Sequence, residues 1–190
     1  PELVLCDIDT FTTLPKNEFS NGMSEVIKYG MFCDSELLDA LASDSFNIEK
    51  TVARCVEIKA RVVADDEFDK GERAFLNFGH TIAHTVELLS GYKTPHGSAV
   101  AIGMAAITKA AVEAGICESE ALICLLPLLK KYSLPEACPY SVDEVYKAAL
   151  KDKKNAHGKI TLVLPTAKGE SILKKCDYHE LHKIIELGLK

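Results

Sequence analysis

The stretch His96-Gly-Ser-Ala-Val-Ala-Ile-Gly-Met-Ala-Ala-Ile-Thr-Lys-Ala-Ala-Val-Glu-Ala114 gives the strongest indication of fold class in this chain. Most of its side chains are small or apolar, and alanine, its commonest residue, has the highest helix propensity. Small side chains suit close helix packing, so we expect residues 99–114 to form a buried helix that His96 opens. This indicates a helical domain with a tightly packed interior.

Three of the six histidines lie at or shortly before the start of this helix, namely His80, His84 and His96. His80 and His84 end the segment Asn77-Phe-Gly-His-Thr-Ile-Ala-His84, and their spacing places them on one face of a helix. His96 follows a short loop and can return to that face. Neutral imidazoles and a carboxylate are the ligands that a catalytic zinc ion prefers. The spacing is equally typical of ordinary core or surface histidines, so both interpretations stay open.

An acidic and a basic residue, Glu25 and Lys28, lie upstream within Gly22-Met-Ser-Glu-Val-Ile-Lys-Tyr-Gly30. On a helix they are neighbours on one face, and an exposed pair of this kind stabilises a helix by only a few tenths of a kcal/mol. The apolar side chains around them favour partial burial instead. Buried charges of this type would need strong partners.

Further cations and amides are candidates for binding an anion. Arg73 and Asn77 stand about two turns and one turn before the first of these histidines, on a single helix predicted over residues 72–89. Their donors suit a phosphate or a carboxylate. Lys59 and the pair Lys153-Lys154 are additional candidates, and each group taken alone is also well explained as a solvated surface residue.

The composition of the 190 residues excludes several classes of protein. The net charge of −6 is spread over both signs with no run of five like charges, which argues against a nucleic-acid surface. No stretch of eighteen apolar residues and no secretory leader pattern is present, so we expect no membrane span. The seven cysteines are scattered without a CxxC pair, which is typical of reduced thiols in a cytoplasmic protein.

Apolar periodicity predicts a mainly α, multi-helix domain with one small β-hairpin near residues 159–176. A short helix carrying Leu37, Leu38 and Leu41 should be capped by Asp34 or Ser35. A strand is expected at residues 3–8, at the start of the chain. The other predicted helices cover residues 17–31, with a stop at Gly30, and residues 47–64, 72–89, 119–132, 142–152 and 178–189.

In their order and spacing, these motifs resemble the 3-dehydroquinate synthase family. The resemblance covers essentially the whole chain but only about the C-terminal half of the family's length, which is its metal- and substrate-binding domain. It rests on Glu18, Asn21 to Gly30, Lys59, Asp66-Glu67, Gly71 to Arg73, Leu76 to His84, His96-Gly97, Ala99 to Met104 and Asp152 to Lys154.

The resemblance implies an enzyme of the shikimate pathway of aromatic amino acid biosynthesis. Members of that family are carbon–oxygen lyases that convert 3-deoxy-D-arabino-heptulosonate 7-phosphate to 3-dehydroquinate and phosphate. It further implies transient use of NAD, a divalent metal (Zn²⁺ or Co²⁺), a cytoplasmic homodimer as the full-length form, and a small phosphorylated sugar acid as substrate, with no nucleic-acid or membrane partner.

The resemblance also assigns roles to individual residues. The implied metal ligands are Glu25, His80 and His96. The implied substrate-binding residues are Lys28, Lys59, Arg73, Asn77, His84 and Lys153, the last favoured over Lys154. Of these, the catalytic roles fall to His84, Lys28, Lys59 and Arg73. The implied positions beside the cofactor are Thr13, Leu14 and Glu18.

Two departures from the family pattern concern the site. Ala83 stands where the family commonly has Gly, and Ser98 stands where it commonly has Glu. The second change leaves open which groups support the metal ligands from behind.

No glycine-rich dinucleotide-binding motif is present. Asp7 to Pro15 also match the segment that joins the family's two domains, so the resemblance implies that residues 1–15 are a remnant of the interdomain strand and linker and that residues 16–190 are the helical domain. The NAD-binding domain would lie upstream, so the isolated chain should be inactive.

Other interpretations remain. A related sugar-phosphate cyclase would share the fold and chemistry but take another sugar, and iron-dependent alcohol and glycerol dehydrogenases share the architecture more distantly. A non-catalytic metal-binding module belongs to a different class altogether.

Overall fold

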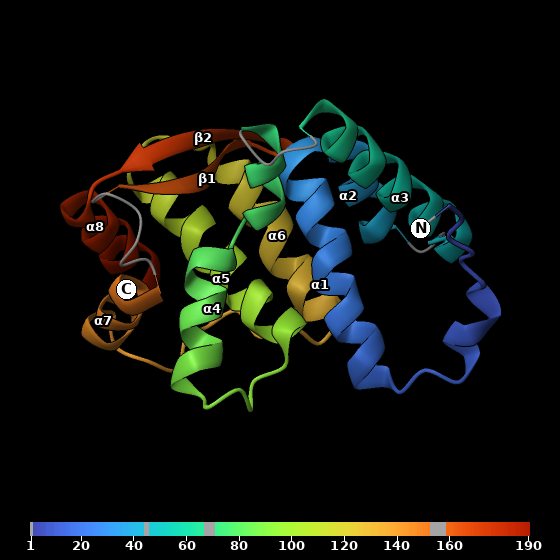
Figure 1. The fold of residues 1–190 in the computed structure, drawn as a ribbon, viewed down its shortest axis with the longest axis horizontal. Coiled ribbons are helices and arrows are strands. Elements are labelled where there is room, and N and C mark those ends of the chain that lie inside the picture. Colours follow the sequence, from blue (N-terminus) through green and yellow to red (C-terminus); the bar gives the residue numbers. More distant parts are fainter. Residues whose placement is uncertain (1, 44–45, 67–70, 153–158) are drawn as a thin grey trace.

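The computed structural model describes residues 2–43, 46–66, 71–152 and 159–190, which form a layered assembly of helices with one β-hairpin across its top (Figure 1). The predicted fold class is thereby confirmed. In chain order the elements are η1 (Ile8–Thr12), α1 (Lys16–Cys33), α2 (Ser35–Ala42), α3 (Ile48–Asp65), η2 (Glu72–Asn77), α4 (His80–Leu89), α5 (His96–Glu113), α6 (Ser119–Lys131), α7 (Val142–Asp152), β1 (Ile160–Ala167), β2 (Glu170–Cys176) and α8 (Tyr178–Leu189).

Helix α5 is the centre of the domain, as its small side chains predict. It packs against α1, α4, α6, α8 and β1, and it is buried around most of its circumference. Even a polar side chain near its middle, that of Thr108, is fully buried. A helix covered on so many sides requires side chains that do not hold its neighbours apart.

Two glycines of α5 bring its backbone into near contact with the helices on either side. A Cβ added at Gly97 would lie 2.2 Å from the carbonyl oxygen of Asn21 in α1. A Cβ added at Gly103 would lie 2.1 Å from the carbonyl oxygen of Gly79, which caps α4. No side chain larger than hydrogen fits at either position unless the helices move apart.

The prediction of one continuous helix over residues 72–89 is wrong, because the helix is interrupted near its middle. Residues 72–77 form the 3-10 helix η2, and α4 begins only at His80. Between them Gly79 has φ +79°, a left-handed conformation that glycine tolerates. The backbone nitrogen of Met104 would lie 2.8 Å from a Cβ at this position, so the break lets α5 approach closely.

The strand expected at residues 3–8 is not formed. Residues 2–7 have no regular secondary structure, and Ile8 begins η1 after Asp7, whose side chain caps it. A strand needs a partner, and the sheet found within the described residues contains only β1 and β2. Leu3 and Leu5 are consequently 82% and 86% exposed.

The remaining elements follow the predictions closely. Asp34 caps α2 by accepting from the backbone N–H of Leu37, and it also accepts from Arg54 of α3 at 2.6 Å. Helix α1 runs to Cys33, past the stop expected at Gly30. The antiparallel hairpin pairs Ile160 with Cys176 and covers α5, α6 and the end of α1. None of the described helices is long and apolar enough to cross a bilayer.

The near contact at Gly97 can be tested by adding a single methyl group. Gly97→Ala should lower the free energy of unfolding by about 2 kcal/mol, because the new Cβ overlaps the α1 backbone. Gly22→Ala is the matched control, since Gly22 lies on α1 with no atom within 4 Å of the added Cβ. The control should raise stability by about 0.5 kcal/mol through higher helix propensity. Urea unfolding measures both, and equal stabilities of Gly97→Ala and wild type would refute the packing argument.

Candidate metal centre

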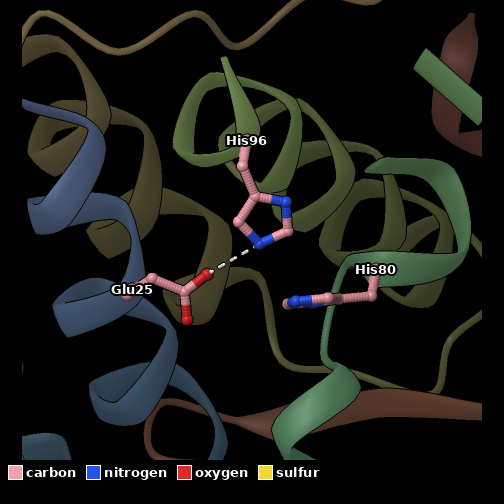
Figure 2. A group of neighbouring side chains, drawn as sticks. All are labelled: Glu25, His80 and His96. Atoms are coloured by element: carbon pink, nitrogen blue, oxygen red, sulfur yellow. Dashed lines mark ion pairs between the residues drawn. The ribbon is translucent and has the colours of Figure 1, made fainter. Parts of the chain in front are cut away.

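Glu25, His80 and His96 converge from three helices. Glu25 lies on α1, while His80 and His96 are the first residues of α4 and α5. Their potential ligand atoms all lie within 4.8 Å of one another. Figure 2 shows the carboxylate and the two rings pointing toward a shared space, with the His96 ring nearest to Glu25.

His80 is held in one orientation by the backbone. Its Nδ1 lies 3.1 Å from the carbonyl oxygen of Phe78, and because a carbonyl only accepts, Nδ1 carries the proton. Nε2 then keeps its lone pair. Burial, with a smaller effect from the Lys28 charge, lowers the pKa of His80 to about 4. The imidazole is therefore neutral at pH 7 and needs no deprotonation to bind a metal.

The two oxygens of Glu25 have different surroundings. Oε2 lies 2.6 Å from the Nζ of Lys28, whereas Oε1 is buried with no hydrogen-bond partner in the described structure. Burial alone would raise the pKa of Glu25, but the charge and hydrogen bond of Lys28, aided by His80 and His96, lower it overall. A buried, ionised oxygen without a donor is costly, and a cation at this point would satisfy it.

His96 completes the cluster with its own hydrogen bond. Its Nδ1 lies 3.0 Å from Oε1 of Glu87, and its Nε2 lies 3.4 Å from Oε1 of Glu25. The carboxylate of Glu87 can only accept, so the ring proton lies on Nδ1. In the neutral ring, Nε2 then keeps its lone pair, which faces Oε1 of Glu25.

The structure brings two of the predicted substrate-binding residues, Lys28 and His84, into contact with the cluster. Lys28 is only 4% exposed and pairs with Glu25. The ring of His84 packs edge-on against His80, with centroids 5.5 Å apart. Lys59 on α3, and Arg73 and Asn77 on η2, are exposed. Because of the break at Gly79, Arg73 and Asn77 do not share a helical stripe with His80, so that part of the sequence argument is wrong.

The predicted cofactor positions lie in the segment before α1 and in the first turn of α1, whose course Figure 1 shows. Thr13 follows η1 and donates to the carbonyl oxygen of Thr10, and Leu14 is exposed. Glu18 lies in the first turn of α1 and accepts from Asn17. The predicted substrate-binding Lys153, with Lys154, lies outside the described residues.

An open pocket of about 420 Å³ adjoins the cluster between α4 and α7. His84 and Glu87 line it from α4, and Lys151 lines it from α7. The pocket therefore offers both hydrogen-bond donors and acceptors next to the candidate ligands.

Sequence reasoning missed Glu87 and left the role of Ser98 open. Glu87 stands seven positions after His80, two helical turns along the same face, so its spacing could have identified it. Ser98, which occupies the family's glutamate position, donates to the side-chain oxygen of Asn21 at 2.9 Å. It therefore ties α5 to α1 rather than supporting a histidine.

Sequence comparison gives consistent matches. The family model described as 3-dehydroquinate synthase C-terminal matches residues 22–155. The 3-dehydroquinate synthase of Pelobacter propionicus is 40% identical over 184 residues, covering 91% of this chain and 51% of the relative. That of Nostoc punctiforme is 44% identical over 182 residues, covering 89% and 50%. The chain thus spans about half the length of the curated relatives it matches.

Solved structures share the fold at low sequence identity. A 2-epi-5-epi-valiolone synthase from Streptomyces hygroscopicus, with NAD⁺ and Zn²⁺ bound, superposes with a TM-score of 0.80 at 22% identity, covering 93% of this chain and 51% of that one. A 2-deoxy-scyllo-inosose synthase complexed with carbaglucose-6-phosphate, NAD⁺ and Co²⁺ gives 0.76 at 20% identity, covering 92% and 53%. From the family match and the sequence relatives, the chain belongs to the 3-dehydroquinate synthase family, of which it carries the C-terminal domain.

Proposed function

We propose that this chain is the metal- and substrate-binding half of a 3-dehydroquinate synthase, which converts 3-deoxy-D-arabino-heptulosonate 7-phosphate to 3-dehydroquinate and phosphate. The observation that carries the proposal is the convergence of Glu25, His80 and His96 in a chain of this family. Each of the three side chains presents an oxygen or nitrogen lone pair to the space between them. Oε1 of Glu25 is buried there without a hydrogen-bond donor.

The donor set fits a divalent metal. Two neutral imidazoles and one carboxylate leave a coordination position open, as catalytic zinc sites do. Zn²⁺ or Co²⁺ bound there would act as a Lewis acid on the oxygens of the substrate. The valiolone and inosose synthase structures hold these two ions, which supports the assignment.

The neighbouring residues would bind and orient the substrate. Lys28 lies 2.6 Å from Glu25, so a substrate oxygen held beside Glu25 would also lie near its ammonium. His84, at the rim of the pocket beside His80, is the candidate for moving a proton. The phosphate and carboxylate would be held by the exposed donors Lys59, Arg73 and Asn77, together with Lys153.

Bound NAD would supply reversible hydride transfer to this site. We propose that the domain that binds it is not contained in these 190 residues. Two observations support this view. The relatives are about twice as long as this chain, and no dinucleotide-binding motif occurs in the sequence. Residues 1–15, with Leu3 and Leu5 exposed, would then connect the domains, placing Thr13, Leu14 and Glu18 beside the cofactor.

A second candidate is a cyclase acting on a different sugar phosphate. It is favoured by the likeness to 2-deoxy-scyllo-inosose synthase, whose structure holds carbaglucose-6-phosphate. Sequence identity favours the first candidate, since the curated synthases reach 44% whereas this neighbour reaches 20%.

The metal assignment is tested by removing each ligand. Glu25→Ala, His80→Ala and His96→Ala should each weaken Zn²⁺ binding by at least tenfold, because three protein ligands hold a catalytic zinc ion. Competition with a chromophoric chelator measures the affinity. His179→Ala is the control, since His179 is exposed on α8, and it should bind like wild type. Unchanged binding in all three ligand variants would show that zinc binds elsewhere.

Activity is tested with a chimera in which the chain follows the N-terminal part of the Pelobacter propionicus synthase. With NAD and Zn²⁺ it should release phosphate from the heptulosonate phosphate and form dehydroquinate, and its His80→Ala variant should not. The isolated chain should do neither and should bind NAD weakly in calorimetry. Turnover or micromolar NAD binding by the isolated chain would contradict the proposed division. Cyclisation of glucose 6-phosphate alone would favour the second candidate.

Acid should destabilise the metal-free chain through His80. The folded pKa is lowered from 6.5 to about 4, so between these values the unfolded chain binds more protons than the folded chain. The contribution of His80 to the free energy of unfolding is complete above pH 6.5 and is lost as the pH falls toward 4. At pH 5 the free energy of unfolding is lower by about 2 kcal/mol. Urea unfolding at pH 7.5 and pH 5 should show a smaller pH effect in His80→Gln than in wild type, and the same effect in His179→Gln. If the free energy of unfolding of His80→Gln depends on pH as that of wild type does, the assignment of the acid effect to His80 is wrong.

A further inference from the structure

We propose that Glu87 is a positioning residue that keeps the ring proton of His96 on Nδ1 and thereby directs the lone pair of Nε2 at the metal. The inference rests on the proposed function, since it concerns the same three-ligand site. Glu87 itself would not touch the metal.

The contact between the two residues has the geometry of a directed hydrogen bond. Oε1 of Glu87 lies 3.0 Å from Nδ1 of His96, while Nε2 on the far side of the ring faces Glu25. The side chain of Glu87 is only 17% exposed, whereas that of His96 is 49% exposed. A largely desolvated carboxylate makes a stronger hydrogen bond than a surface one.

The need for such a partner follows from the chemistry of imidazole. A neutral ring has one N–H and one lone pair, and the nitrogen that carries the proton is set by the hydrogen bond at the other nitrogen. His80 has the carbonyl oxygen of Phe78 for this purpose. His96 is half exposed and follows Pro95 at the first position of α5, and among the described residues Glu87 is the hydrogen-bond partner of its Nδ1. Without Glu87 the ring proton is free to move to Nε2, and the ring itself is free to rotate.

The position of Glu87 couples two of the ligands. It lies on α4, the helix that begins at His80, and it bonds a residue on α5. One rigid helix therefore carries one ligand and the group that orients another. Loss of a carboxylate that supports a metal-bound histidine typically weakens metal affinity 10- to 100-fold.

A purely structural role is the competing explanation, because the same contact spans the turn between α4 and α5. That role predicts a less stable metal-free chain. The positioning role predicts weaker metal binding by a chain of unchanged stability. The two roles are therefore separated by measuring affinity and metal-free stability on the same variants.

The experiment compares wild type, Glu87→Ala, Glu87→Gln and Glu113→Ala, with Zn²⁺ and Co²⁺ alone as probes. Glu113 is exposed in the last turn of α5, at the opposite end from His96, and its substitution changes the net charge equally. Chelator competition gives the Zn²⁺ affinity, visible absorption of the Co²⁺-loaded chain reports the coordination geometry, and thermal unfolding gives metal-free stability.

Glu87→Ala should bind Zn²⁺ about 10- to 100-fold more weakly, with a changed Co²⁺ spectrum and a metal-free melting temperature like that of wild type. Glu87→Gln should lose less, because its amide oxygen can accept the same hydrogen bond, and Glu113→Ala should match wild type. Zn²⁺ binding by Glu87→Ala within twofold of wild type overturns the inference, and so does a weaker affinity accompanied by an equally lowered metal-free stability. Failure of the metal site itself is distinguishable, because Zn²⁺ binding would then survive His96→Ala.

Discussion

The near contact between the backbone of α5 and the backbones on either side of it determines the geometry of this domain. Gly97 brings α5 against α1 beside Asn21, and Gly103 brings it against the turn that opens α4. Because the carboxylate lies on α1 and the two imidazoles open α4 and α5, these distances are also the distances between the candidate ligands. Packing of the core and assembly of the site are therefore one constraint rather than two.

The electrostatics of the site carry an imbalance that a cation would correct. Lys28 pairs with one oxygen of Glu25, while the other is buried without a hydrogen-bond donor and faces Nε2 of His96. Burial keeps His80 neutral as well. The protein thus holds lone pairs in a partly desolvated space where they have no donor to bond. Such an arrangement costs stability in the absence of a metal and favours metal binding when one is available.

Much of the fold and the convergence of the three candidate ligands could be predicted from the sequence, and the predictions that failed share a cause. Periodicity located the hairpin, the buried helix α5 and the cap at Asp34, because these depend on neighbouring residues. The break at Gly79 depends instead on the approach of Met104 from another helix, and residues 3–8 lack a pairing partner. The convergence of Glu25 with the histidines was expected from family resemblance, since spacing cannot fix how two distant helices cross. The helical spacing of Glu87 places it on the same face as His80. Its hydrogen bond with His96, however, depends on the turn between α4 and α5, which the spacing does not predict.

Two contacts near the candidate site span very different lengths of chain, and this difference has a consequence for how the domain folds. The contact between Glu87 and His96 spans nine residues, whereas that between Asn21 and Ser98, which closes α1 onto α5, spans 77. Closing the longer loop costs about 2 kcal/mol more in chain entropy. Local contacts form first when closure entropy dominates, so the helical pair that carries both imidazoles assembles ahead of the helix that carries the carboxylate. We therefore expect α1 to dock onto this pair after it has formed, and its docking brings the candidate carboxylate ligand to the two imidazoles.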